Sequence, residues 1–110
     1  MGASIPPNDK PIERFDELLD VFVSAEKPRT EWRVGAEMEK FGVVAATGEP
    51  INYNGKRGVA RILEALADRF GWRRDYEYDG APLIALVRDG ASITLEPGSQ
   101  LELSGAPLVH

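Results

Sequence analysis

The sequence predicts an α+β protein, with an antiparallel sheet that carries two helices on one face. Two segments repeat apolar side chains at spacings of three and four residues, which is typical of amphipathic helices. Four short apolar runs follow, separated by turn-forming pairs such as Asp-Gly, and this pattern indicates an antiparallel meander. A chain of 110 residues with 43% hydrophobic side chains suits a single domain. We expect a flexible tail at residues 1–8 and one folded unit at residues 9–110.

The first helix is expected between Asp9, a suitable N-terminal cap, and Pro28, which ends it. Its apolar stripe comprises Ile12, Phe15, Leu18, Leu19, Phe22 and Val23. The second helix is expected at residues 56–70, with Gly71 as its C-terminal cap. Both stripes are expected to pack on the same face of the sheet.

The first strand is expected at residues 32–44, and four more at residues 72–78, 83–88, 91–96 and 99–104. In the first strand, alternation puts Ala36 and Met38 on one face and Glu37 and Glu39 on the other. The apolar face would meet the helices. The turns between the later strands are expected at Asp79-Gly80, Asp89-Gly90 and Pro97-Gly98.

Composition excludes several classes of function. The net charge of −5 disfavours nucleic-acid binding, because an acidic chain repels phosphate backbones. The absence of cysteine excludes disulfides and thiolate zinc sites within these residues. No apolar run is long enough to cross a membrane, and the first ten residues do not resemble a signal peptide. We therefore expect a cytoplasmic protein with neither nucleic-acid nor membrane partners.

Four acidic side chains are the candidate site. Glu37 and Glu39 project from one face of the first strand. A hairpin at Pro97-Gly98 would place Glu96 and Glu102 on the polar face of the last two strands, while the leucines and isoleucine between them join the core. If the strands are adjacent, four carboxylates share one side of one sheet. Like charges close together need a compensating cation, and Mg²⁺ prefers carboxylate oxygen. The alternative is a solvated face with well-separated acids.

Two segments resemble a known family. Residues 35–42, GAEMEKFG, resemble the G-T-E-H-E-K-F-G signature of the plant and proteobacterial glutamate–cysteine ligases. Residues 91–108, ASITLEPGSQLELSGAPL, resemble their S-I-T-L-E-P-G-G-Q-F-E-L-S-G-A-P segment. The resemblance extends over about residues 32–108. Ala36, Met38, Ser99 and Leu101 depart from the family pattern; the first two lie on the predicted apolar face, and the last two changes are mild.

The resemblance implies an ATP-dependent ligase with a glutamine-synthetase-like fold. Such enzymes join the γ-carboxyl of glutamate to the amine of cysteine, the first step of glutathione synthesis, through an acyl phosphate. It implies that Glu37, Glu39, Glu96 and Glu102 hold Mg²⁺ ions that clamp ATP. It also implies that Gln100 and Ser104 line the glutamate site. No proton-transferring catalytic residue is assigned, because phosphoryl transfer depends mainly on positioning and charge neutralisation.

Family members are several hundred residues long, so the resemblance implies that this chain is an N-terminal fragment without ligase activity of its own. Two other functions are kept open. The chain could belong to a related carboxylate–amine ligase with another amine, as in the ergothioneine branch. It could also be a non-catalytic stand-alone domain, although such a domain has no need of all four acids.

Overall fold

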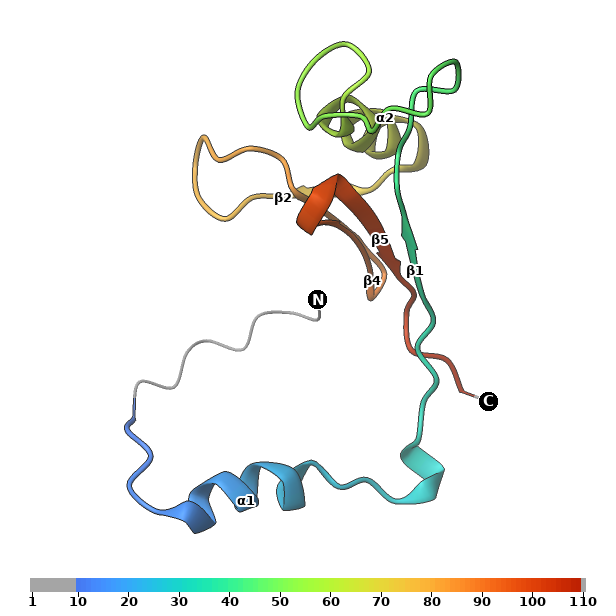
Figure 1. The fold of residues 1–110 in the computed structure, drawn as a ribbon. Coiled ribbons are helices and arrows are strands. Elements are labelled where there is room, and N and C mark those ends of the chain that lie inside the picture. Colours follow the sequence, from blue (N-terminus) through green and yellow to red (C-terminus); the bar gives the residue numbers. More distant parts are fainter. Residues whose placement is uncertain (1–9, 110) are drawn as a thin grey trace.

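The computed structural model describes residues 10–109, and it confirms the α+β class with two helices and a five-stranded antiparallel sheet. The strands are β1 (Glu37–Lys40), β2 (Arg73–Asp75), β3 (Ala85–Arg88), β4 (Ala91–Glu96) and β5 (Gln100–Ser104). Their order in the sheet is β1-β5-β4-β3-β2 (Figure 1). The first strand in the chain therefore pairs with the last, and β4 lies at the centre.

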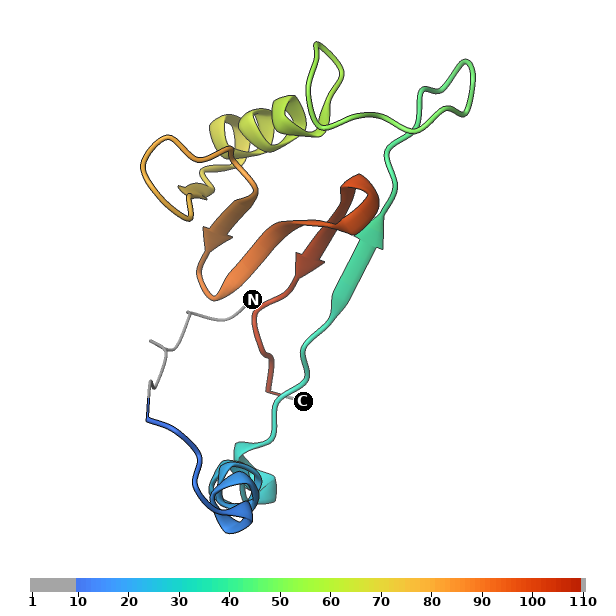
Figure 2. The same ribbon diagram turned by 60° about the vertical axis from the view of Figure 1, so that its left-hand side comes forward.

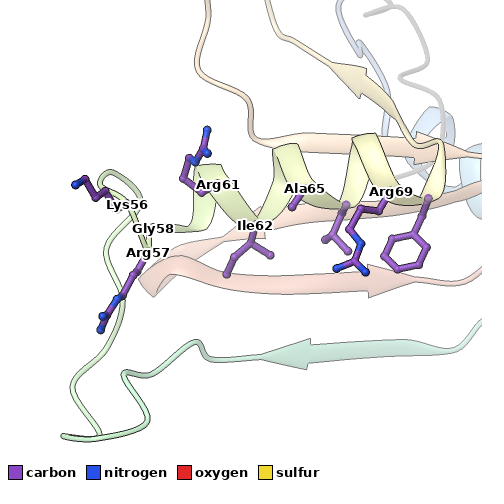
Figure 3. A pocket seen from close by; sticks show the side chains of 9 residues that line it. Lys56, Arg57, Gly58, Arg61, Ile62, Ala65 and Arg69 are labelled. Atoms are coloured by element: carbon purple, nitrogen blue, oxygen red, sulfur yellow. The ribbon is translucent and has the colours of Figure 1, made fainter.

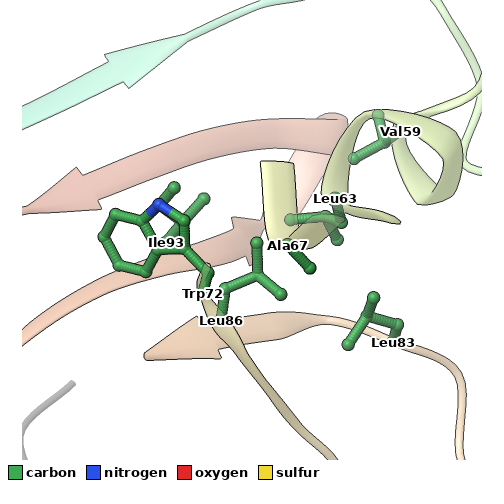
Figure 4. Packing of buried hydrophobic residues seen from close by; sticks show 7 residues of the cluster. All are labelled: Val59, Leu63, Ala67, Trp72, Leu83, Leu86 and Ile93. Atoms are coloured by element: carbon green, nitrogen blue, oxygen red, sulfur yellow. The ribbon is translucent and has the colours of Figure 1, made fainter. Parts of the chain in front are cut away.

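The helix α2 (Val59–Phe70) covers part of one sheet face, as its apolar stripe predicts. Val59, Leu63 and Ala67 are buried on it, and they pack with Leu86 and Ile93 of the sheet (Figure 4). Gly71 ends the helix in the left-handed conformation, with φ of 70°, as predicted. The helix begins three residues later than expected, because residues 56–58 form a turn before it.

Polar contacts hold α2 to the strands β2 and β3. Arg74 donates hydrogen bonds to Glu64 and Asp68 on successive turns of α2, both at 2.7 Å. These two carboxylates raise the pKa of Arg74. Arg88 donates a hydrogen bond of 2.6 Å to the carbonyl of Phe70, and its guanidinium lies over the ring of Trp72. The C-terminal half of α2 is thus held to the sheet by charge as well as by packing.

The helix α1 (Phe15–Ala25) contradicts the prediction that both helices pack on one face. None of its residues is buried, and it lies beyond the opposite end of the sheet from α2 (Figures 1 and 2). Its start also differs from the prediction, because Pro11 lies outside it and Arg14 is its N-cap residue. The proposed cap Asp9 and the expected tail at residues 1–8 lie outside the described residues.

The strand expected at residues 32–44 is shorter than predicted. A 3₁₀ turn, η1 (Arg29–Glu31), precedes it, and β1 proper has four residues. Single bridges extend the pairing, from Val34 to Leu108 and from Val43 to Pro50. The strand β4 has its predicted bounds, and β2, β3 and β5 are shorter than predicted by one to four residues.

The turns agree with the sequence in two of three places. Asp89 and Gly90 both have positive φ, 49° and 81°, and they join β3 to β4 as predicted. Pro97, Gly98 and Ser99 form a short 3₁₀ turn, η2 (Pro97–Ser99), between β4 and β5. The pair Asp79-Gly80 lies instead inside a nine-residue connection between β2 and β3.

Candidate functional site

The acidic residues occupy the sheet face opposite α2. Directly opposed residues of antiparallel strands point to the same face. Glu39 on β1 opposes Glu102 on β5, and Glu102 opposes Thr94 on β4. The next row runs from Glu37 through Ser104 to Ser92. The alternate residues, among them Met38, Leu103 and Ile93, therefore face α2.

The structure brings Glu39 and Glu102 together as direct cross-strand partners, and Glu37 lies one row away. Glu96 is at the end of β4 that adjoins the η2 turn, where it opposes Gln100. The strands of the two motifs are thus adjacent, which alternation along each strand left open. This adjacency arises because β5 is sandwiched between β1 and β4, which chain order alone does not specify.

Hydroxyl groups orient two of the carboxylates. Thr94 Oγ1 donates to Glu96 Oε1 at 2.7 Å, and Ser104 Oγ donates to Glu102 Oε1 at 2.7 Å. Thr94 is itself buried, with 5% of its surface exposed, so its bond to Glu96 lies in a largely desolvated part of the face. The hydroxyls limit the positions that these carboxylates adopt.

The surroundings of Glu39 on this face raise the pKa of its carboxyl. Desolvation, a hydrogen bond to Glu102 and the negative charges of Glu102, Glu96 and Glu37 all raise the pKa of Glu39. Each of the three other acids therefore contributes to the field at this one carboxyl. The acids that act on Glu39 come from three strands and two distant parts of the chain.

This donor set suits a hard divalent cation. Carboxylate and hydroxyl oxygens are the ligands that Mg²⁺ takes in proteins, and a cation would relieve the repulsion that raises the pKa of Glu39. Among residues 10–109, no three acidic or histidine side chains converge closely enough to form a ready-made metal cage. Mg²⁺ commonly takes only one or two carboxylates and keeps water or phosphate oxygens as its other ligands, so the arrangement fits that mode.

The two residues predicted to bind substrate are on the same face. Ser104 is bonded to Glu102, as described above, and the side-chain amide of Gln100 donates to the carbonyl of Pro97 at 3.1 Å. The amide therefore braces the η2 turn between β4 and β5. A role for either residue in binding substrate stays a prediction.

Sequence reasoning missed a cavity of about 990 Å³ at the other end of this face. Arg73, Asp75, Tyr76, Ser92 and Thr94 contribute to its lining. Arg73 opposes Val87, which opposes Ser92, so Arg73 lies in the same row of the sheet as Glu37. The alternation of Arg73 and Arg74 places one arginine on each face, and only the sheet register reveals which one joins the acids.

Comparisons with known proteins agree with both motifs. The family model for Glutamate-cysteine ligase family 2 (GCS2) matches residues 33–110. Glutamate–cysteine ligase B, chloroplastic, from Oryza sativa subsp. japonica is 40% identical over 111 residues, which cover 96% of this chain and 21% of the relative. The corresponding chloroplastic ligases of Brassica juncea and Arabidopsis thaliana are 39% and 38% identical over 112 residues, covering 96% of this chain. They are covered to 21% and 20% of their own lengths.

The comparisons correct one expectation from sequence. A cytoplasmic protein was inferred from the lack of a recognisable targeting segment, whereas the curated relatives are named as chloroplastic. Composition carries little information on location, because targeting signals are short and separate from the fold. Within the described residues, neither helix has the length and apolar character needed to cross a bilayer.

The match extends over more than two thirds of the chain and includes β1, β4 and β5 with all four acids, and the chain spans about a fifth of the length of the relatives. The chain belongs to glutamate–cysteine ligase family 2.

Proposed function

We propose that this chain supplies part of the active-site sheet of an ATP- and Mg²⁺-dependent glutamate–cysteine ligase with a glutamine-synthetase-like fold. The observation that carries this function is the placement of the two family motifs on adjacent strands, so that Glu39 and Glu102 are cross-strand partners. The substrates would be glutamate, cysteine and ATP. The relatives named above are all glutamate–cysteine ligases, which favours cysteine over another amine.

In this function Glu37, Glu39, Glu96 and Glu102 hold the metal ions. A Mg²⁺ ion held there would supply positive charge against the nucleotide phosphates, which favours transfer of a phosphoryl group to the γ-carboxylate of glutamate. The carboxylates act as ligands and not as proton carriers, since phosphoryl transfer needs chiefly positioning. Ser104 and Thr94 keep two of these ligands in place through the hydrogen bonds that they donate.

Residues on the same face would also position glutamate. Gln100 and Ser104 flank Glu102 on β5 and offer an amide and a hydroxyl to a polar substrate. The acyl phosphate of glutamate has a good leaving group, so the amine of cysteine displaces phosphate and forms the amide bond. The sheet holds these donors on regular strands, which keeps their spacing fixed during the reaction.

Titration of the chain with MgCl₂ tests the metal site directly. We expect the side-chain carboxyl resonances of the four acids to shift together in NMR spectra, and Glu39→Gln or Glu102→Gln to weaken binding about ten-fold or more. Glu77→Gln is the matched control, because it removes the same charge from the connection between β2 and β3. Equal shifts of acidic residues across the whole chain would contradict a defined site.

A chimera tests the reaction and the choice of amine. Residues 33–110 would replace the matching segment of the rice ligase, and product formation would be measured with cysteine and with other amines. We expect activity with cysteine, a loss of about 100-fold or more with Glu39→Gln, and no change with Glu77→Gln. An active chimera that tolerates Glu39→Gln, or that prefers another amine, would refute the assignment.

A further inference from the structure

The η2 turn joins the two strands that carry Glu96 and Glu102. Two consecutive residues of this turn, Gly98 and Ser99, have positive φ, 75° and 61°. Glycine adopts such a backbone at little cost, whereas the Cβ of another residue is crowded there by the following carbonyl oxygen. The backbone strain of the turn is therefore located at Ser99.

The side chain of Ser99 lies on the face of the sheet away from the acids. It lines a hollow of about 410 Å³ together with Met38 and Leu103, which face α2. Ile62 lines the same hollow, and its side chain extends from α2 toward the strands (Figure 3). A substitution at Ser99 therefore acts on the acidic face only through the backbone of the turn.

Gln100 lies at the other end of the turn, on the acidic face. It opposes Glu96 across the hairpin, and its side-chain amide donates the 3.1 Å hydrogen bond to the carbonyl of Pro97. Because Pro97 directly follows Glu96, this bond links the two ends of the turn. A rotation of Ser99 toward negative φ would redirect the chain at this point, and the bond opposes that rotation. We call this hydrogen bond the turn brace.

Glu96 is the acid whose position depends most on the turn, because it is the last residue of β4. The hydroxyl of Thr94 donates to its carboxylate, which fixes that carboxylate relative to β4. Its position relative to Glu102 and Glu39 depends instead on how the hairpin closes. In the closed hairpin, the charge of Glu96 is one of those that raise the pKa of Glu39.

We propose that Gln100 is a positioning residue, whose turn brace holds the strained η2 turn closed and so keeps Glu96 in place beside the other three acids. This inference rests on the proposed function, in which Glu96 is a metal ligand. It gives Gln100 a role through the backbone that is separate from a contact with glutamate. The amide can serve both roles, because the turn brace uses only one of its N–H groups.

The titration with MgCl₂ tests the turn brace in variants of Gln100 and Ser99. Gln100→Met keeps an unbranched side chain of similar size without a donor, and we expect it to weaken Mg²⁺ binding about ten-fold. The addition of Ser99→Gly should restore most of the affinity, because glycine adopts the turn without strain. Ser99→Ala is the matched control. It removes the same hydroxyl but keeps Cβ, so its addition should restore nothing.

The side-chain carboxyl resonances of the metal-free chain give a measure that does not depend on metal binding. We expect Gln100→Met to shift the resonance of Glu96 more than that of Glu37, which lies on β1 away from the turn. Ser99→Gly should reverse this shift. The amide resonances of β3 show whether the sheet is intact in each variant. Equal shifts of Glu96 and Glu37 in an intact sheet would overturn the positioning role.

Kinetics of the chimera separate positioning from a substrate contact. We expect Gln100→Met to raise the Mg²⁺ concentration needed for half-maximal activity, and Ser99→Gly to lower it again. A raised KM for glutamate with unchanged Mg²⁺ affinity, or no recovery of Mg²⁺ binding with Ser99→Gly, would overturn the positioning role alone. A parent chain that binds no Mg²⁺ would refute the proposed function and this inference with it.

Discussion

The pKa of Glu39 depends on all three of the other acids on its face of the sheet. Desolvation, a hydrogen bond with the opposing Glu102 and the charges of the other three acids all raise the pKa of its carboxyl. The raised pKa means that folding favours the protonated form relative to the unfolded chain, whose value is near 4.5. The stability that this titration contributes to the folded chain is therefore fully present below pH 4.5. It is lost as the pH rises through the pKa that Glu39 has in the folded chain.

Replacing Glu39 by Gln should therefore change how stability depends on pH. We expect Glu39→Gln to raise the free energy of unfolding relative to the parent chain at pH 7, with a smaller difference at pH 4. Urea denaturation at both pH values measures this. Glu77→Gln, which removes a charge outside the acidic face, should give similar differences at the two pH values. Parallel stability curves for Glu39→Gln and its parent would contradict the coupling.

Leu63 is the second single residue on which a prediction rests, because it lies at the centre of the hydrophobic core. Its side chain is fully buried between α2 and the sheet, in a cluster of only seven buried residues (Figure 4). We expect Leu63→Ala to cost about 3 kcal/mol, because it removes apolar contact and leaves a cavity. The neighbouring Ile62 is 36% exposed, so Ile62→Ala should cost much less. Equal losses in chemical denaturation would show that the core is not centred on this helix face.

At the scale of elements, the start of α2 depends on close backbone approach. A Cβ on Gly58 would lie 2.5 Å from the carbonyl oxygen of Asn54 and would also collide with the carbonyl of Tyr53. We expect Gly58→Ala to destabilise the chain by about 2 kcal/mol or more, since backbone atoms cannot rotate away. Gly35→Ala is the control, because nothing lies within 4 Å of its Cβ position. Thermal unfolding of both variants measures the difference.

The elements also show what local sequence determines. The bounds of β4 were predictable because Asp89-Gly90 fixes the turn before it and strict alternation runs from Ala91 to Glu96. The strand predicted at residues 32–44 was too long, because β1 exists only where β5 offers a partner. Strand length is a property of the pair, and a single segment does not reveal its partner.

The candidate site was likewise predictable from local sequence in part, while the rest depends on how the strands pair. Alternation correctly put Glu37 with Glu39, and Glu96 with Glu102, on polar faces. The row that joins Glu39 to Glu102, and the place of Arg73 on the same face, depend on the register between strands. That register comes from pairing distant parts of the chain, so spacing in the sequence does not contain it.

At the scale of the whole molecule, the chain divides into two parts. The sheet and α2 enclose the core, while α1 extends from them and gives the molecule a longest dimension of 54 Å. The apolar stripe of α1 predicted burial, but none of the helix residues is buried. An amphipathic pattern indicates that a helix has an apolar face to cover, but it does not indicate which segment covers it.

Amide hydrogen exchange separates these parts. We expect the amides of α1 to exchange fast, because nothing among residues 10–109 packs closely on the helix, and those of β4 and β5 to exchange slowly. The amides of β4 and β5 serve as the internal control, because their pairing lies within one chain. Equal protection of α1 and of β4 and β5 would contradict this division of the chain.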